Sequence, residues 1–122
     1  MAKNKKILIV DDDSSFVESA EAILKIKKFD VIKAFNAETG VEALVVEYPD
    51  IVLLDVNLPD KNGFEVLKTI KNSKNFSTLP VILITGDMTV HVDKGFAEGA
   101  DDVIFKPIDI DKLSLNINRL LK

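Results

Sequence analysis

Short apolar runs rich in β-branched residues recur along the chain, and longer segments of helical periodicity separate them. No run alternates apolar with polar residues, so each is expected to be covered on both faces, as the strands of a parallel sheet are. The second and fifth runs are the shortest, which fits strands at the edges of the sheet. The runs are Ile7–Val10, Val31–Ile32, Ile51–Leu54, Val81–Ile84 and Val103–Phe105.

Between the runs, apolar residues recur at spacings of three and four, which predicts helices with one buried face. Asn36, Asp109 and either Ser14 or Ser15 are the predicted N-caps, because their side chains accept hydrogen bonds from free backbone amides. Gly99 is expected to end the fourth helix. The five apolar stripes are Phe16, Ala20, Ile23 and Leu24; Ala37, Val41, Leu44 and Val45; Val66, Leu67 and Ile70; Met88, Val92 and Phe96; and Ile110, Leu113, Ile117 and Leu120.

The order of elements is a strand followed by a helix, repeated five times, which indicates an α/β fold with helices on both faces of a parallel sheet. Right-handed crossovers leave few topologies. The doubly wound order 2-1-3-4-5 is the one we expect, with a ligand site at the carboxyl ends of the strands. A length of 122 residues predicts a single domain spanning positions 1–122.

Composition narrows the possible functions. The 16 basic and 20 acidic residues give a net charge of −4, whereas nucleic-acid phosphates are bound by clustered Lys and Arg. The apolar runs are far shorter than the roughly 20 residues that span a bilayer, and the start of the chain lacks the apolar stretch of a signal peptide. Cysteine is absent, which is compatible with a reducing compartment. We therefore expect a cytoplasmic protein with no nucleic-acid partner and no membrane insertion.

Acidic, hydroxyl and basic side chains follow four of the five runs, at strand ends that meet at one edge of the predicted sheet. Two carboxylates about 4 Å apart repel by roughly 4 kcal/mol at an effective dielectric constant of about 20. A hard divalent cation offsets that repulsion, and oxygen ligands without His or Cys favour Mg²⁺, Mn²⁺ or Ca²⁺. The residues are Asp11, Asp12 and Asp13 after the first run, Asp55 after the third, Thr85 after the fourth and Lys106 after the fifth.

A cation, a lysine and a hydroxyl group around one carboxylate form a site for a phosphoryl group. Asp55 is the candidate nucleophile, because carboxylates form acyl-phosphate intermediates. The barrier is expected to fall because charge on the equatorial oxygens meets the cation, the Lys106 ammonium and the Thr85 hydroxyl already in place.

Four motifs, in this order and spacing, resemble the response-regulator receiver domain, and the resemblance covers nearly the whole chain. It implies the same 2-1-3-4-5 order, of which a member of this family is a standard example. The motifs are ILIVDDD (Ile7 to Asp13), LLDVNLPDKNG (Leu53 to Gly63), ILITG (Ile82 to Gly86) and GADDVIFKP (Gly99 to Pro107).

The resemblance implies how the acidic residues divide their roles. Asp55 would be the phosphoacceptor, and Asp11 and Asp12 would form the acidic pair near Mg²⁺, with Mn²⁺ as a possible substitute. Asp12 and Asp55 would be the direct carboxylate ligands, and Asn57 would add its backbone carbonyl.

The resemblance also covers the fourth and fifth strands. Thr85 would hydrogen-bond the new phosphoryl group and Lys106 would pair with it. The Lys106–Pro107 bond is a candidate cis peptide, because the cis form costs little before proline. Asp13 would lie outside the site, near the start of the first helix. The family usually carries a mobile aromatic three residues before the lysine, but here Val103 has one stiff torsion and no ring, so the usual threonine–aromatic coupling is not expected.

By the same resemblance, the chain would take a phosphoryl group from the phosphohistidine of a sensor histidine kinase or a histidine phosphotransfer protein. It would signal by a population shift at the surface of the fourth helix, fifth strand and fifth helix, as a monomer or as a weak dimer that depends on phosphorylation. We expect a stand-alone receiver with a downstream protein target, and no turnover of external substrate. Asn57 and Asp87 match positions that flank the attacking water, and a polar pair there predicts self-dephosphorylation within seconds to minutes.

Three alternative functions remain. A Mg²⁺-dependent phosphohydrolase would need a second acid–base Asp two residues after the nucleophile, where this chain has Asn57. A flavodoxin-type mononucleotide binder would need a phosphate-binding loop after the first strand, where the DDDSS segment repels anions. A receiver that signals without phosphate would not need the complete acidic site.

Overall fold

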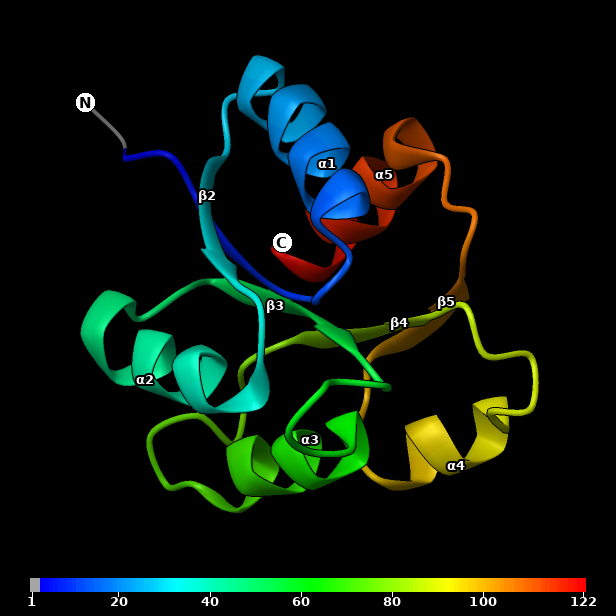
Figure 1. Cartoon of the computed structure of the whole chain (residues 1–122). Coiled ribbons are helices and arrows are strands. Elements are labelled where there is room, and N and C mark those ends of the chain that lie inside the picture. Colours follow the sequence, from blue (N-terminus) through cyan, green and yellow to red (C-terminus); the bar gives the residue numbers. More distant parts are fainter. Residues whose placement is uncertain (1–2) are drawn as a thin grey trace.

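The computed structural model describes residues 3–122, which form a five-stranded parallel sheet with the strand order β2-β1-β3-β4-β5 (Figure 1). The predicted α/β class and topology are confirmed, and the two shortest apolar runs lie in the edge strands. The strands are β1 (Lys6–Val10), β2 (Asp30–Ala34), β3 (Ile51–Asp55), β4 (Val81–Thr85) and β5 (Asp102–Phe105).

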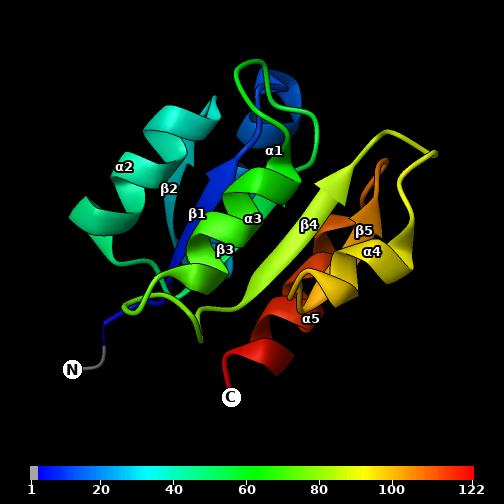
Figure 2. The same ribbon diagram turned by 90° about the horizontal axis from the view of Figure 1, so that it is seen from below.

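Helices cover both faces of this sheet. Helices α1 and α5 lie on one face, and α2, α3 and α4 lie on the other (Figures 1 and 2). Within residues 3–122, no helix is both long enough and apolar enough to cross a membrane. The helices are α1 (Ser14–Ile26), α2 (Ala37–Glu47), α3 (Gly63–Asn72), α4 (Val92–Ala97) and α5 (Ile110–Leu120).

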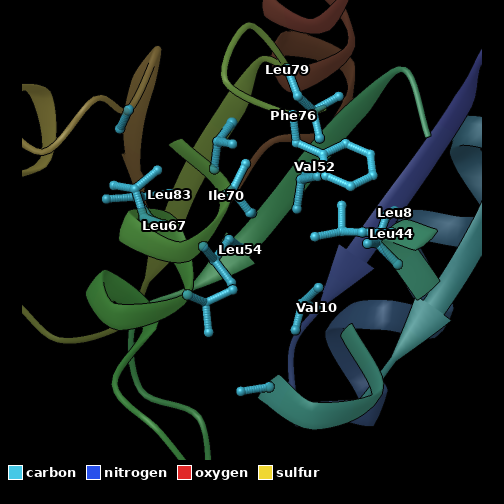
Figure 3. Packing of buried hydrophobic residues seen from close by; sticks show 14 of the residues in the cluster. Leu8, Val10, Leu44, Val52, Leu54, Leu67, Ile70, Phe76, Leu79 and Leu83 are labelled. Carbon is cyan, nitrogen blue, oxygen red and sulfur yellow. The ribbon is translucent and has the colours of Figure 1, made fainter. Parts of the chain in front are cut away.

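Alternate residues of the central strands enter two separate apolar clusters. In β1, Ile7 and Ile9 pack beneath α1 and α5, whereas Leu8 and Val10 pack beneath α2 and α3. Figure 3 shows the second cluster, in which Leu44 of α2 lies beside Leu8. Each fully buried side chain of this kind contributes about 1.5–3 kcal/mol to folding. Both faces of each central strand are thus covered, which explains why these strands are continuously apolar.

Helix ends largely follow the predicted caps. Asn36 and Asp109 cap α2 and α5 as expected, but the predicted serine cap of α1 is wrong. Ser14 is already helical, and Asp13 one position earlier is the N-cap, accepting a hydrogen bond from the third helical amide at 3.2 Å. Gly99 follows α4 with a φ of 104°, a left-handed conformation that glycine adopts without steric cost.

Two helices approach the sheet through a glycine, which displaces part of the predicted apolar stripes. A Cβ atom at Gly95 of α4 would lie 2.6 Å from Cγ2 of Val103. One at Gly40 of α2 would lie 2.9 Å from Cγ1 of Val10. Because glycine carries no hydrophobic signal, periodicity assigns the buried face to apolar neighbours that are in fact exposed. These are Val45 (60% exposed), Val92 (38%), Phe96 (47%) and Met88 (76%), which precedes α4.

The contact between Gly95 and Val103 predicts an unusual response to alanine. Alanine normally favours a helix over glycine by up to about 1 kcal/mol, but here its methyl group would overlap Val103. We expect Gly95→Ala to lower the free energy of unfolding by about 1–2 kcal/mol, measured by urea denaturation. The same change should cost less in a Val103→Ala background, and Gly86→Ala, with no atom within 4 Å of the added Cβ, is the matched control. An equal cost in both backgrounds would contradict this packing.

Candidate functional site

Three carboxylates converge at the carboxyl end of the sheet. Asp11 and Asp12 follow β1, and Asp55 is the last residue of β3. One oxygen from each of the three side chains lies within 4.8 Å of the others. Asp11 is fully buried and Asp55 is 6% exposed, whereas Asp12 is open to solvent. The predicted convergence of these groups at one sheet edge is therefore present.

Backbone hydrogen bonds extend the sheet by one residue and thereby place the neighbouring groups. The amide of Asp11 donates to the carbonyl of Ala34 at 3.0 Å, which continues the ladder between β1 and β2. The amide of Lys106 donates to the carbonyl of Thr85 at 2.8 Å, which continues the ladder between β4 and β5. Lys106 therefore lies beside Thr85, and the Lys106–Pro107 peptide bond is cis as predicted.

The same short turn orients the functional side chain at three strand ends. Oδ1 of Asp11 accepts a hydrogen bond from the amide two residues later at 2.9 Å, and Oδ1 of Asp55 does so at 3.2 Å. The hydroxyl of Thr85 accepts one from the amide of Asp87 at 3.0 Å. Such turns are typical of Asp and Thr side chains. At Asp11 and Asp55 the turn fixes one carboxylate oxygen, so the second oxygen is left for other contacts.

Lys106 carries the positive charge of the site. Its Nζ atom lies 2.7 Å from Oδ2 of Asp11 and 3.6 Å from Oδ2 of Asp13, and 4.7 Å from the centre of the Phe16 ring. As expected, Asp13 lies at the start of α1 and outside the cluster of Asp11, Asp12 and Asp55, but its contact with Lys106 was not predicted. The contact with Phe16 was not predicted, since its spacing in the sequence marks it only as part of an apolar stripe.

The crowding of negative charge changes the acidity of the buried groups. Burial, and then the negative charge of Asp11, raise the pKa of Asp55 to about 7. Burial alone would lower the pKa of Lys106, but its hydrogen bond to Asp11 and the surrounding carboxylates outweigh burial and raise the pKa above its usual value. The site is therefore strongly negative when all carboxylates are ionised.

The residues fit a hard divalent cation. One ammonium, that of Lys106, lies 2.7 Å from the buried Oδ2 of Asp11 and faces a cluster of three carboxylates. A cation bound to Asp11, Asp12 and Asp55 would offset the negative charge that remains. An all-oxygen donor set suits Mg²⁺ or Mn²⁺.

The loop between β3 and α3 folds back closely against the strand. The amide of Gly63 donates to the carbonyl of Val56, and Asn57 forms an isolated bridge with Asn62. A Cβ atom at position 63 would lie 2.2 Å from the carbonyl oxygen of Asp55, so this position requires glycine. The close return brings Asn57, the residue predicted to offer its carbonyl to the cation, against Asn62 and leaves residues 58–61 as an outer turn.

Asn57 and Asp87, predicted to flank the site, are in contact. Nδ2 of Asn57 donates to Oδ2 of Asp87 at 3.3 Å, and the hydroxyl of Thr89 donates to Oδ1 of Asp87 at 2.6 Å. The resemblance had indicated Asn57 and Asp87, whereas the contact of Thr89 was not predicted. The pair links the loop after β3 to the loop after β4.

The raised pKa of Asp55 predicts a pH-dependent stability. Because this pKa is about 7 in the folded chain against an ordinary value of 3.8, the unfolded chain loses the proton first, and the folded state loses stability as the pH rises between these values. Without divalent cations, we expect Asp55→Asn to raise the midpoint of thermal unfolding by roughly 5 °C at pH 8, and to have little effect near pH 4. Differential scanning calorimetry at both pH values tests this.

The control for that experiment is Asp93→Asn, which removes an exposed carboxylate of α4. A stabilisation by Asp55→Asn that is independent of pH would contradict the shared crowding of Asp55 and Asp11. Adding Mg²⁺ should restore stability to the wild type by mass action.

Comparison with known proteins identifies the family. The family model for the response regulator receiver domain matches residues 7–118. The chain is 35% identical over 119 residues to the cell cycle response regulator CtrA of Brucella ovis, a match that covers 96% of this chain and 50% of that protein. The chain thus spans about half the length of the curated relatives it matches.

Solved structures agree with this assignment. A putative response regulator from Chloroflexus aurantiacus superimposes with a TM-score of 0.91 at 30% identity, covering 98% of both chains. A CheY-like response regulator receiver domain protein from Methanospirillum hungatei gives a TM-score of 0.89 at 30% identity, covering 98% of this chain and 94% of that one. The chain belongs to the response regulator receiver domains of two-component signalling.

Proposed function

We propose that Asp55 accepts a phosphoryl group from a phosphohistidine in the presence of Mg²⁺. The observation that carries this proposal is the convergence of Asp11 and Asp12 on the strand-end carboxylate of Asp55, with Lys106 paired to Asp11. The donor would be a sensor histidine kinase or a histidine phosphotransfer protein. The chain would act as a single receiver domain over residues 1–122 and would not turn over an external substrate.

The transfer step follows from the groups around Asp55. A carboxylate oxygen of Asp55 forms a bond to phosphorus while the phosphorus–nitrogen bond breaks, and the electron pair of that bond returns to the imidazole. Bound Mg²⁺ supplies positive charge that offsets the crowding of carboxylates and the charge on the transferred oxygens. The Lys106 ammonium exchanges part of its pairing with Asp11 for the phosphoryl oxygens. The Thr85 hydroxyl, whose oxygen accepts the amide of Asp87, donates its proton to a phosphoryl oxygen.

An apolar hollow beside the site supports docking of a donor helix. It has a volume of about 540 Å³ and runs from Asp13 and Lys106 along the first turns of α1 and α5. Its apolar residues include Phe16, Ile108 and Ile110. A donor helix that docked there would cover its own apolar face and would bring a histidine side chain to the carboxyl end of the sheet.

The output surface in this proposal consists of α4, β5 and α5, where a downstream protein binds. Exposed apolar side chains at Met88, Val92 and Phe96 support a protein contact there. Val103 lies beneath Gly95 of α4, so the position of the family's mobile aromatic is occupied by a small side chain in contact with the helix. Phosphorylation would shift the population of states at this surface.

Phosphorylation of Asp55 can be tested with a small-molecule donor. We expect incubation with acetyl phosphate and Mg²⁺ to add one phosphoryl group to the wild type, detected by intact mass spectrometry, because Lys106 and the added Mg²⁺ would together supply positive charge to the phosphoryl oxygens. Asp55→Asn should remain unmodified, and EDTA should abolish modification of the wild type. Modification of Asp55→Asn to the same extent would refute the assignment, and repeated turnover of a small phosphate ester would favour a phosphohydrolase.

The lifetime of the phosphoryl group tests the proposed role of Asn57 and Asp87. We expect loss of phosphate within seconds to minutes in Mg²⁺, because a polar pair beside the phosphoryl group can orient water. Asp87→Ala should lengthen the half-life severalfold, measured by quenched-flow sampling and mass spectrometry. Thr89→Val is the matched control, since it removes one hydrogen bond to Asp87 but keeps the carboxylate. A wild-type half-life of many hours would contradict the prediction.

A further inference from the structure

Asp60, in the loop between β3 and α3, contacts the first turn of a helix that lies elsewhere in the sequence. Its Oδ1 accepts a hydrogen bond from the amide of Ala37 at 2.8 Å, and its Oδ2 accepts one from the amide of Glu38 at 3.0 Å. These two amides begin α2. A single carboxylate therefore holds both free amides from a position 22 residues or more along the chain.

Helix α2 already has a cap of its own. The side chain of Asn36 accepts the amide of Thr39 at 2.8 Å, which is the usual role of an N-cap. Asp60 takes the two amides that Asn36 leaves free, and the two hydrogen bonds lower the pKa of Asp60. The positive end of the helix favours this carboxylate further. The contact is thus a tether between two segments rather than a duplicate cap.

The tether spans the two sides of the acidic cluster. On one side, the carbonyl of Ala34, which ends β2 just before α2, accepts the amide of Asp11. On the other side, Asp60 lies within the turn that Asn57 and Asn62 close by their backbone bridge. Asp60 therefore joins the loop that carries Asn57 to the segment that holds Asp11.

We propose that Asp60 is a positioning residue for the dication, an inference that rests on the proposed function. It would act through the backbone of Asn57, holding the loop in register with the carboxylates that follow β1. Without the tether, the loop would keep its own bridge and its contact with Asp87, but its outer turn would lose its attachment to α2. Outer residues that orient metal ligands typically change metal affinity about 10–100-fold when they are lost.

The chain provides a matched control for a purely structural role. Asn36→Ala and Asp60→Ala both remove an acceptor from the first turn of α2, so both should lower the midpoint of thermal unfolding. Only Asp60→Ala releases the loop after β3. Asp60→Asn keeps one acceptor oxygen in place of two, so it should retain part of the tether.

The experiment measures Mg²⁺ affinity by isothermal titration calorimetry in the wild type and the three variants, each checked to be folded by circular dichroism. We expect Asp60→Ala to raise the Kd about tenfold, Asp60→Asn to raise it less, and Asn36→Ala to leave it unchanged. In the Mg²⁺-free protein, the NMR amide signal of Asn57 should shift in Asp60→Ala but not in Asn36→Ala.

The outcomes separate this inference from the proposed function. Equal Kd values for Asp60→Ala and Asn36→Ala, with Mg²⁺ binding intact in the wild type, would overturn the positioning role alone. Absence of Mg²⁺ binding by the wild type would overturn the proposed function and this inference together. A tenfold loss in Asp60→Ala with partial recovery in Asp60→Asn would support both.

Discussion

Repulsion among three carboxylates at one end of the sheet is the constraint on which the rest of the site depends. The fold buries Asp11 and most of Asp55, so water cannot screen them, and it supplies Lys106 as the nearest fixed positive charge. One ammonium does not balance three carboxylates. The site therefore favours additional positive charge and a proton on Asp55, because burial and then the neighbouring charge of Asp11 disfavour the ionised carboxylate.

Orientation within this crowded site comes from the backbone. At the ends of β1, β3 and β4, the amide two residues beyond the functional side chain donates a hydrogen bond to it. Each of these hydrogen bonds ties a side chain to the turn that follows its own strand. The backbone itself therefore orients Asp11, Asp55 and Thr85. The close return at Gly63 makes the loop after β3 part of the same rigid arrangement.

The fold could be predicted largely because helices cover both faces of the sheet. Every residue of a central strand is then buried, so the strands appear in the sequence as continuous apolar runs. The acidic site could be predicted because its residues lie at strand ends, where topology alone brings them together. Several features could not be predicted. Gly40 and Gly95 face the sheet where an added Cβ would overlap Val10 and Val103, yet they carry no hydrophobic signal. The contact of Asp13 with Lys106 joins the start of α1 to the end of β5 and leaves no pattern in the sequence. Asp60 was missed because its partners are backbone amides, which every residue other than proline has.

The contact between Gly95 and Val103 has a consequence for how α4 can move. The backbone of α4 rests directly on a compact branched side chain of β5, so the space that a large ring would need to turn inward is filled by the helix itself. A structural change that reaches α4 through Val103 would therefore move the helix backbone, because Val103 has one stiff torsion and no ring. If Val103 were replaced by tyrosine, the ring would accordingly lie outside the contact between β5 and α4, and it would not become a mobile aromatic beneath the helix.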